Sequence, residues 1–223
     1  MIIVIDGPAG SGKSSTAKAL ASICNLVFLD SGALYRTVTL LWLQENKPDD
    51  KQFYEALSSA QIHSSSDDSL FRVYLHGKDV SKDIRKSSVA ECVSEVAKKP
   101  FVRSYVNQIM RRIVQTGSFI ADGRDLGTAV FPDADLKFFM DASVEERARR
   151  RFKELKKAEP ENITITYEDV LNNVRHRDKV DSQREMDPLA KADDAILIDT
   201  TGLTFEEQLK MMSDYIKKLK HKP

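Results

Sequence analysis

A glycine-rich stretch near the start of the chain, residues 7–14 (GPAGSGKS), most constrains what this sequence can fold into. It matches the pattern GxxxxGK[ST] and lies between an apolar run, residues 2–5, and a helical pattern that begins near Lys13. Glycines at these positions let backbone N–H groups converge on phosphate oxygens, and the helix that follows presents the positive end of its dipole. Lys13 can reach β- and γ-phosphates, and the Ser14 hydroxyl is a ligand for Mg²⁺. The stretch therefore predicts a phosphate-binding loop.

A glycine-rich turn that binds nothing is the alternative, but it leaves Lys13 and Ser14 unexplained. We expect the Lys13 ammonium to be solvated in the free protein and to meet negative charge that develops during a reaction. The residues expected to form the phosphate site are Gly7, Pro8, Ala9, Gly10, Ser11, Gly12, Lys13, Ser14 and Ser15.

Length and charge bound the class of protein. The 223 residues suit one large α/β domain, or a core with a smaller insert. Thirty-four basic residues balance thirty-four acidic ones, so no overall field attracts nucleic acid or an anionic membrane, and a small partner is expected. No apolar run approaches the length of a membrane span, and no leader sequence precedes the first strand. We therefore expect a cytoplasmic protein that acts as a monomer.

Short apolar runs alternate with helical patterns along most of the chain, which is typical of an α/β fold with a parallel sheet. The five predicted core strands cover residues 2–5, 26–29, 118–121, 136–140 and 195–199. Residues 61–82 differ, because a Ser/Asp-rich turn is followed by an alternating strand pattern at residues 70–75. This segment predicts a small antiparallel β insert.

Charged residues follow two of the predicted strands. Asp122, Arg124 and Asp125 come directly after the third strand, and carboxyl ends of strands are where doubly wound folds bind ligands. Two carboxylates flanking an arginine suggest contacts with phosphate and with a metal ion or a base, whereas the alternative is a surface turn. Tyr35 and Arg36 occupy the first turn of the helix after the second strand, where Arg36 either faces the same ligand or is merely solvated.

Two helical patterns late in the chain carry further clusters. Arg147 and Arg151 lie one turn apart in an arginine-rich helix that precedes a polar loop, which predicts a lid that closes over triphosphate charge; a nucleic-acid patch is the alternative. Arg177, Asp181 and Arg184 are spaced i, i+4, i+7 in the next helix, so that all three can face one ligand. An exposed ladder of ion pairs is the alternative for these three residues.

Two short motifs point elsewhere and are rejected. Residues 46–49 (NKPD) match the guanine-reading motif of GTPases, but they link two amphipathic helices and indicate a helix stop, a turn and a new N-cap. Residues 176–178 (HRD) match a protein-kinase tripeptide without the other signatures of that class. A P-loop GTPase or regulatory switch stays the alternative from another class of protein.

Taken together, these motifs resemble the bacterial cytidylate kinase family, within the nucleoside monophosphate kinase group of P-loop proteins. The motifs that carry the resemblance are GPAGSGKSS, DSGALYR, DGRDLGT and RHRDKVDSQR with the following Pro188 and Leu189. Many P-loop proteins share the first motif, whereas the other three in this order are far more specific. The resemblance extends from the first strand to the terminal helix.

The resemblance implies a P-loop NTPase-type α/β fold, in which helices flank a parallel five-stranded sheet. The core would comprise residues 1–30 and 101–223, with a short lid at about 147–166. A nucleoside monophosphate-binding region would span residues 31–100 and contain the β insert at about 61–82.

The same resemblance implies transfer of the γ-phosphoryl group of ATP to CMP or dCMP, with Mg²⁺ as cofactor on Ser14; a kinase of another small acceptor is the alternative. It places Ser94, Arg103 and Asp125 at the cytosine. The substrate-binding residues that it implies are Ser31, Tyr35, Arg36, Ser94, Arg103, Arg124, Asp125, Arg177, Asp181 and Arg184, of which Arg36 and Arg124 hold the acceptor phosphate and Arg177, Asp181 and Arg184 address the sugar. The expected catalytic residues are Lys13, Asp122, Arg124, Arg147 and Arg151.

Overall fold

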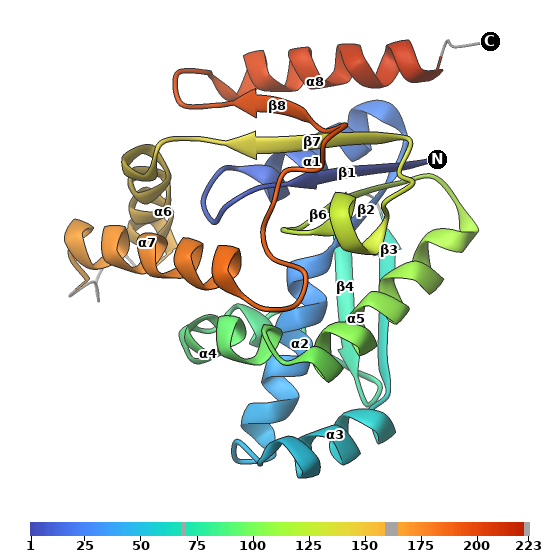
Figure 1. Cartoon of the computed structure of the whole chain (residues 1–223), viewed down its shortest axis with the longest axis vertical. Coiled ribbons are helices and arrows are strands. Elements are labelled where there is room, and N and C mark those ends of the chain that lie inside the picture. The colour runs from blue at the N-terminus through green and yellow to red at the C-terminus, as the bar shows by residue number, and fades with distance from the viewer. Residues whose placement is uncertain (68–69, 159–164, 221–223) are drawn as a thin grey trace.

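A parallel five-stranded sheet forms the centre of the protein. The computed structural model describes residues 1–67, 70–158 and 165–220 (Figure 1). The strands of the sheet are β1 (Ile2–Asp6), β2 (Val27–Asp30), β6 (Phe119–Asp122), β7 (Leu136–Asp141) and β8 (Ile196–Asp199). Their order is β2-β6-β1-β7-β8, and each neighbouring pair is parallel. The predicted fold class is confirmed, and the pairing of Ile5 with Asp122 brings the ends of β1 and β6 together.

Both faces of this sheet are covered, which explains why its strands read as continuous apolar runs. Ile3 and Ile5 face a cluster that includes residues of α1 (Lys13–Cys24) and α8 (Phe205–Lys220). Val4, between them, faces the opposite cluster, to which α2 and α5 contribute. The remaining helices are α2 (Ser31–Gln44), α3 (Asp50–Ser59), α4 (Ser87–Ala97), α5 (Pro100–Ile113), α6 (Val144–Ala158) and α7 (Tyr167–Gln183).

The turn between α2 and α3 confirms that the NKPD motif is a helix boundary. Asn46 and Lys47 have positive φ angles of 58° and 56°, which end α2 in a left-handed turn. Asp49 then caps α3, because its side chain accepts a hydrogen bond from the backbone N–H of Gln52.

The predicted β insert is present as a second, antiparallel sheet. It contains β3 (Ile62–Asp67), β4 (Leu70–Leu75) and β5 (Lys78–Asp79), in that order. Val73 and Leu75 belong to the same hydrophobic cluster as Val4 and Leu29 of the large sheet. The insert and helices α2–α5 therefore share one core with the sheet. The assignment of residues 31–100 to binding the nucleoside monophosphate stays a prediction.

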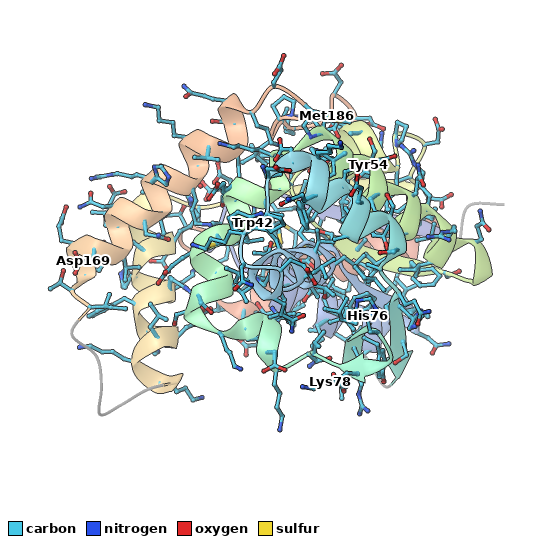
Figure 2. All side chains as sticks on the ribbon, turned by 90° about the horizontal axis from the view of Figure 1, so that it is seen from below. Trp42, Tyr54, His76, Lys78, Asp169 and Met186 are labelled. Carbon is cyan, nitrogen blue, oxygen red and sulfur yellow. The ribbon has the colours of Figure 1, made fainter. Side chains whose placement is uncertain are left out.

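Helices α6 and α7 form a pair beyond the ends of the strands (Figure 1). They pack through a small cluster of Ala148, Val170, Leu171 and Val174. In Figure 2, Asp169 lies at the start of α7, where it forms a capping box with Thr166, and Met186 lies just beyond its end. Residues 147–158 of the predicted lid are helical, whereas residues 159–164 lie outside the described part of the chain. Among the helices described, none is long and apolar enough to cross a membrane.

Candidate active site

The phosphate loop connects β1 to α1 as the sequence predicts, and its glycines adopt conformations that other residues rarely take. Gly12, the N-cap of α1, has a φ of 89°, which places it in the left-handed region. Gly7 has a φ of 146° and packs so closely on β7 that a Cβ atom there would lie 1.9 Å from the carbonyl oxygen of Met140. A side chain at Gly7 would therefore displace the loop from the sheet.

Lys13 is buried, contrary to the expectation that its ammonium is solvated. The side chain is only 4% exposed, and Nζ donates to the carbonyl oxygen of Pro8 over 2.6 Å and to Ser11 Oγ over 3.2 Å. Burial lowers the pKa of Lys13 well below its ordinary value, and the neighbouring Arg124 lowers it further. The loop's own oxygen atoms therefore hold this cation.

Ser14 and Asp122 connect the loop to the end of β6. Ser14 Oγ donates to Asp122 Oδ2 over 2.5 Å, and Ser31 Oγ donates to the Asp122 backbone carbonyl over the same distance. The other carboxylate oxygen of Asp122 is buried and has no hydrogen-bond partner among the residues described. Burial, together with the nearby Asp30 carboxylate, raises the pKa of Asp122 to about 6. The free oxygen next to a serine hydroxyl leaves room for a cation or a donor.

Asp30 and Arg85 form an ion pair that the sequence analysis missed. Asp30 caps α2 by accepting the backbone N–H of Ala33 over 2.8 Å, and its second oxygen accepts from Arg85 over 2.6 Å. Arg36 projects from α2 beside this pair, and burial lowers the pKa of its guanidinium. Because Arg85 lies in a polar stretch without a recognisable motif, only the fold shows that it faces Asp30.

Most of the predicted site residues line one cavity of about 360 Å³. Those that line it are Ala9, Gly10, Gly12, Lys13, Ser14, Ser15, Ser31, Tyr35, Arg36, Ser94, Asp122, Arg124, Asp125, Arg151, Arg177, Asp181 and Arg184. Those that do not are Gly7, Pro8, Ser11, Arg103 and Arg147. A larger groove of about 870 Å³ also contains Arg184, but none of its lining residues belongs to the phosphate loop. The smaller cavity is therefore the candidate active site.

Arg124 and Asp181 form one wall of the cavity. Arg124 Nε donates to Asp181 Oδ2 over 2.9 Å, and Asp181 is only 8% exposed. Arg177, one turn earlier on α7, has a buried Nε without a hydrogen-bond partner in the described structure, and burial beside Arg124 lowers its pKa to about 10. These contacts exclude an exposed ladder of ion pairs. Arg184 follows the end of α7 at Gln183 and points to a different carboxylate.

That carboxylate is Asp125, which lies between two arginines. Arg184 Nη2 donates to Asp125 Oδ1 over 2.6 Å, and Arg103 Nη2 donates to Asp125 Oδ2. Arg103 itself is fully buried and lies 5.5 Å from the centre of the Tyr35 ring. Asp125 therefore faces the cavity, whereas Arg103 supports it from behind.

The arginines of helix α6 have two kinds of surroundings: some contact the backbone of neighbouring segments, and one lines the cavity. Arg147 is 4% exposed, donates to the carbonyl oxygens of Ala9 and Ala142, and pairs with Asp178 over 2.7 Å. Arg150, which the sequence analysis did not single out, donates to the backbone carbonyl of Thr200 over 2.7 Å. Arg151 lines the cavity. Although Arg147 and Arg151 lie on one face of the helix, only Arg151 lines the cavity.

Fold and site together define a P-loop kinase, in which one cavity joins a phosphate loop to a cluster of arginines and carboxylates. The sequence profile described as cytidylate kinase matches residues 3–218. The chain belongs to the cytidylate kinase family.

Individual relatives agree with this assignment. The chain is 43% identical to the cytidylate kinase of Carboxydothermus hydrogenoformans over 218 residues, and this alignment covers 97% of each chain. It is also 43% identical over 222 residues to the cytidylate kinase of Fusobacterium nucleatum, which covers 99% of each. A solved shikimate kinase of Acinetobacter baumannii is similar in fold, with a TM-score of 0.51 at 12% identity over 99% of this chain and 95% of that one.

Proposed function

We propose that this protein transfers the γ-phosphoryl group of ATP to CMP or dCMP and so forms ADP and CDP or dCDP. The observation that carries the proposal is that the phosphate loop and the Asp125 carboxylate line the same cavity. A donor triphosphate bound at the loop and an acceptor whose base lies at Asp125 would therefore occupy the same cavity. The expectation that the protein acts as a monomer stays a prediction.

The cationic side chains around the cavity supply what phosphoryl transfer requires. The bond between the γ-phosphorus and the β,γ-bridging oxygen breaks, and a phosphate oxygen of the acceptor forms the new bond. Lys13, Arg36, Arg124, Arg151 and Arg177 all line the cavity and can stabilise charge on the equatorial oxygens. In this proposal Arg36 and Arg124 hold the acceptor phosphate, while Lys13 and Arg151 act on the donor.

Ser14 and Asp122 fit a bound Mg²⁺. Both present hard oxygen atoms, and the buried Asp122 Oδ1 has no partner within the described residues. When bound there with ATP, Mg²⁺ would neutralise negative charge on the β- and γ-phosphates. Asp122 also orients the Ser14 hydroxyl, and its own position is fixed because Ser31 binds its backbone carbonyl.

Base and sugar would each be bound by a carboxylate that accepts a hydrogen bond from the nucleotide. Asp125 accepts hydrogen bonds only, so it favours the amino group of cytosine and repels the carbonyl oxygen that uracil carries at the same position. Arg124 donates a hydrogen bond to Asp181, and in this proposal Asp181 accepts one from a ribose hydroxyl. Because CMP and dCMP share the 3′-hydroxyl, such a contact serves both acceptors.

A coupled assay of ADP release tests the proposal. ATP is supplied with CMP, dCMP, UMP, AMP or GMP, and turnover is expected to be fastest with CMP or dCMP. A protein that hydrolyses GTP and phosphorylates none of these acceptors would instead support the GTPase alternative. Preference for another acceptor would place the protein among kinases of a different substrate.

A further inference from the structure

Asp187 lies just beyond α7 and contacts both arginines that hold Asp125. Its side-chain Oδ2 accepts a hydrogen bond from Arg103 Nε over 3.0 Å, and its backbone carbonyl accepts one from Arg184 Nε over 2.6 Å. Arg103 and Arg184 each use a second nitrogen to bind a different oxygen of Asp125. Asp187 and Asp125 thus form a closed ring with the two guanidiniums.

The charges in this ring balance. Arg103 is fully buried and the Arg184 side chain is 6% exposed, while Asp125 alone would supply one negative charge for the two cations. A buried cation without a partner is costly, and the Asp187 carboxylate supplies the second negative charge. Asn107 donates to the same Asp187 oxygen over 3.5 Å and accepts a hydrogen bond from the Tyr35 hydroxyl over 3.3 Å. Asn107 therefore connects the ring to Tyr35, which also lines the cavity.

Asp187 adopts an unusual backbone conformation to make these contacts. Its φ is +49°, in the left-handed region, and the residue that follows is Pro188. Non-glycine residues occupy this region at a cost, although aspartate and asparagine tolerate it better than most. Asp187 lies beyond the C-cap of α7, so the helix does not need this backbone conformation to end. The unfavourable conformation is compatible with a role for the side chain beside Asp125.

We propose that Asp187 is a positioning residue that acts through Arg103 and Arg184 to hold the Asp125 carboxylate in the orientation that distinguishes cytosine from uracil. The inference rests on the proposed function, because it assumes that Asp125 faces the base of the acceptor. Each Asp125 oxygen uses one lone pair on an arginine and keeps a second for a ligand. If Arg103 loses its contact with Asp187, the Asp125 carboxylate can rotate. Its oxygen atoms would then no longer point at the amino group that distinguishes cytosine from uracil.

Two variants separate the carboxylate from the backbone conformation. Asp187→Asn removes the charge but tolerates the left-handed conformation, and Asp187→Gly removes the side chain while relieving the strain. Asp193→Asn, six residues further along and exposed, is the matched control. We expect kcat/KM for CMP to fall about tenfold in both Asp187 variants, and the ratio of kcat/KM for CMP to that for UMP to narrow by a similar factor. KM for ATP should stay within about twofold of the wild-type value, because the ring does not touch the phosphate loop.

A double-mutant cycle tests whether Asp187 acts through Asp125. In an Asp125→Ala background, Asp187→Asn should change the CMP-to-UMP ratio no further, because the group that it orients is already gone. If kcat/KM falls by the same factor for CMP and for UMP in both Asp187 variants, Asp187 has only a structural role and the inference is overturned. Thermal unfolding shows whether each variant is folded, and a folded Asp187→Gly protein with the wild-type ratio overturns it as well. A wild-type protein that does not phosphorylate CMP would instead overturn the proposed function.

Discussion

The Asp6 carboxylate accepts a 2.7 Å hydrogen bond from the backbone N–H of Gly127. Its other oxygen accepts the N–H of Leu126 over 2.9 Å. Asp6 is the last residue of β1, directly before the phosphate loop, and Leu126 directly follows Asp125. One buried carboxylate therefore ties the loop that would bind the donor to the loop that carries Arg124 and Asp125.

This arrangement makes the stability of the protein depend on pH. Burial raises the pKa of Asp6 to about 6, although the two backbone hydrogen bonds oppose the rise. Because the carboxyl holds its proton more tightly in the folded state than in the unfolded state, the stability that it contributes falls as pH rises from about 4 to about 6. Above that range the contribution is constant.

Replacing Asp6 by asparagine should remove this dependence. We expect the free energy of unfolding of the wild type, minus that of Asp6→Asn, to fall by about 2 kcal/mol between about pH 4 and pH 7. Urea unfolding at a series of pH values measures both proteins, with Asp193→Asn as an exposed control. A difference that stays constant across this range would show that Asp6 does not titrate as inferred.

Much of the fold could be predicted because its signals are local. The phosphate loop, the five apolar strands and the NKPD turn are each encoded in a few neighbouring residues, and the structure confirms all of them. Contacts between distant segments leave no such signal. Arg103 and Asp187 are 84 residues apart in the chain, and nothing in the sequence near either residue indicates the other.

The contacts of the arginine-rich helix α6 could also not be predicted from the sequence. Helical spacing places Arg147 and Arg151 on one face, as predicted, but does not show what packs against each turn. Arg147 is covered by Ala9 of the phosphate loop and by Asp178 of α7, and only the folded chain brings these together. The catalytic role assigned to Arg147 stays a prediction, and its observed contacts favour holding the loop in place.

Lys13→Ala should abolish most of the phosphoryl transfer and leave the fold intact. Loss of one cation that meets developing phosphate charge costs at least about 3 kcal/mol, or about a hundredfold in kcat. Since burial already disfavours the ammonium, its removal should not lower the unfolding temperature greatly. Steady-state kinetics and thermal unfolding measure the two effects. Retention of most of the turnover at normal stability would contradict the phosphate-loop mechanism.

Arg151→Ala should reduce kcat about tenfold or more, because Arg151 is the α6 arginine of the cluster that lines the cavity. Arg149 on the same helix offers a matched control, since its side chain is 72% exposed and pairs with Glu146. Arg149→Ala should keep kcat within about twofold of the wild type, because an exposed ion pair contributes little. Equal effects of both substitutions on kcat would indicate a general influence of charge and no specific contact by Arg151.

Asp181→Ala tests the proposed sugar contact. Burial alone would raise the pKa of Asp181, but Arg124 and Arg177 outweigh it and hold the pKa below its ordinary value, so the carboxylate is ionised and ready to accept a hydroxyl hydrogen bond. Removing a charged acceptor should lower kcat/KM by about tenfold to a hundredfold. Because the 3′-hydroxyl is common to CMP and dCMP, both should lose activity to a similar extent. Ser182→Ala, at an exposed neighbouring position of α7, should leave both unchanged. Near-normal kinetics of Asp181→Ala with both nucleotides would show that the ion pair with Arg124 is structural and that the sugar is bound elsewhere.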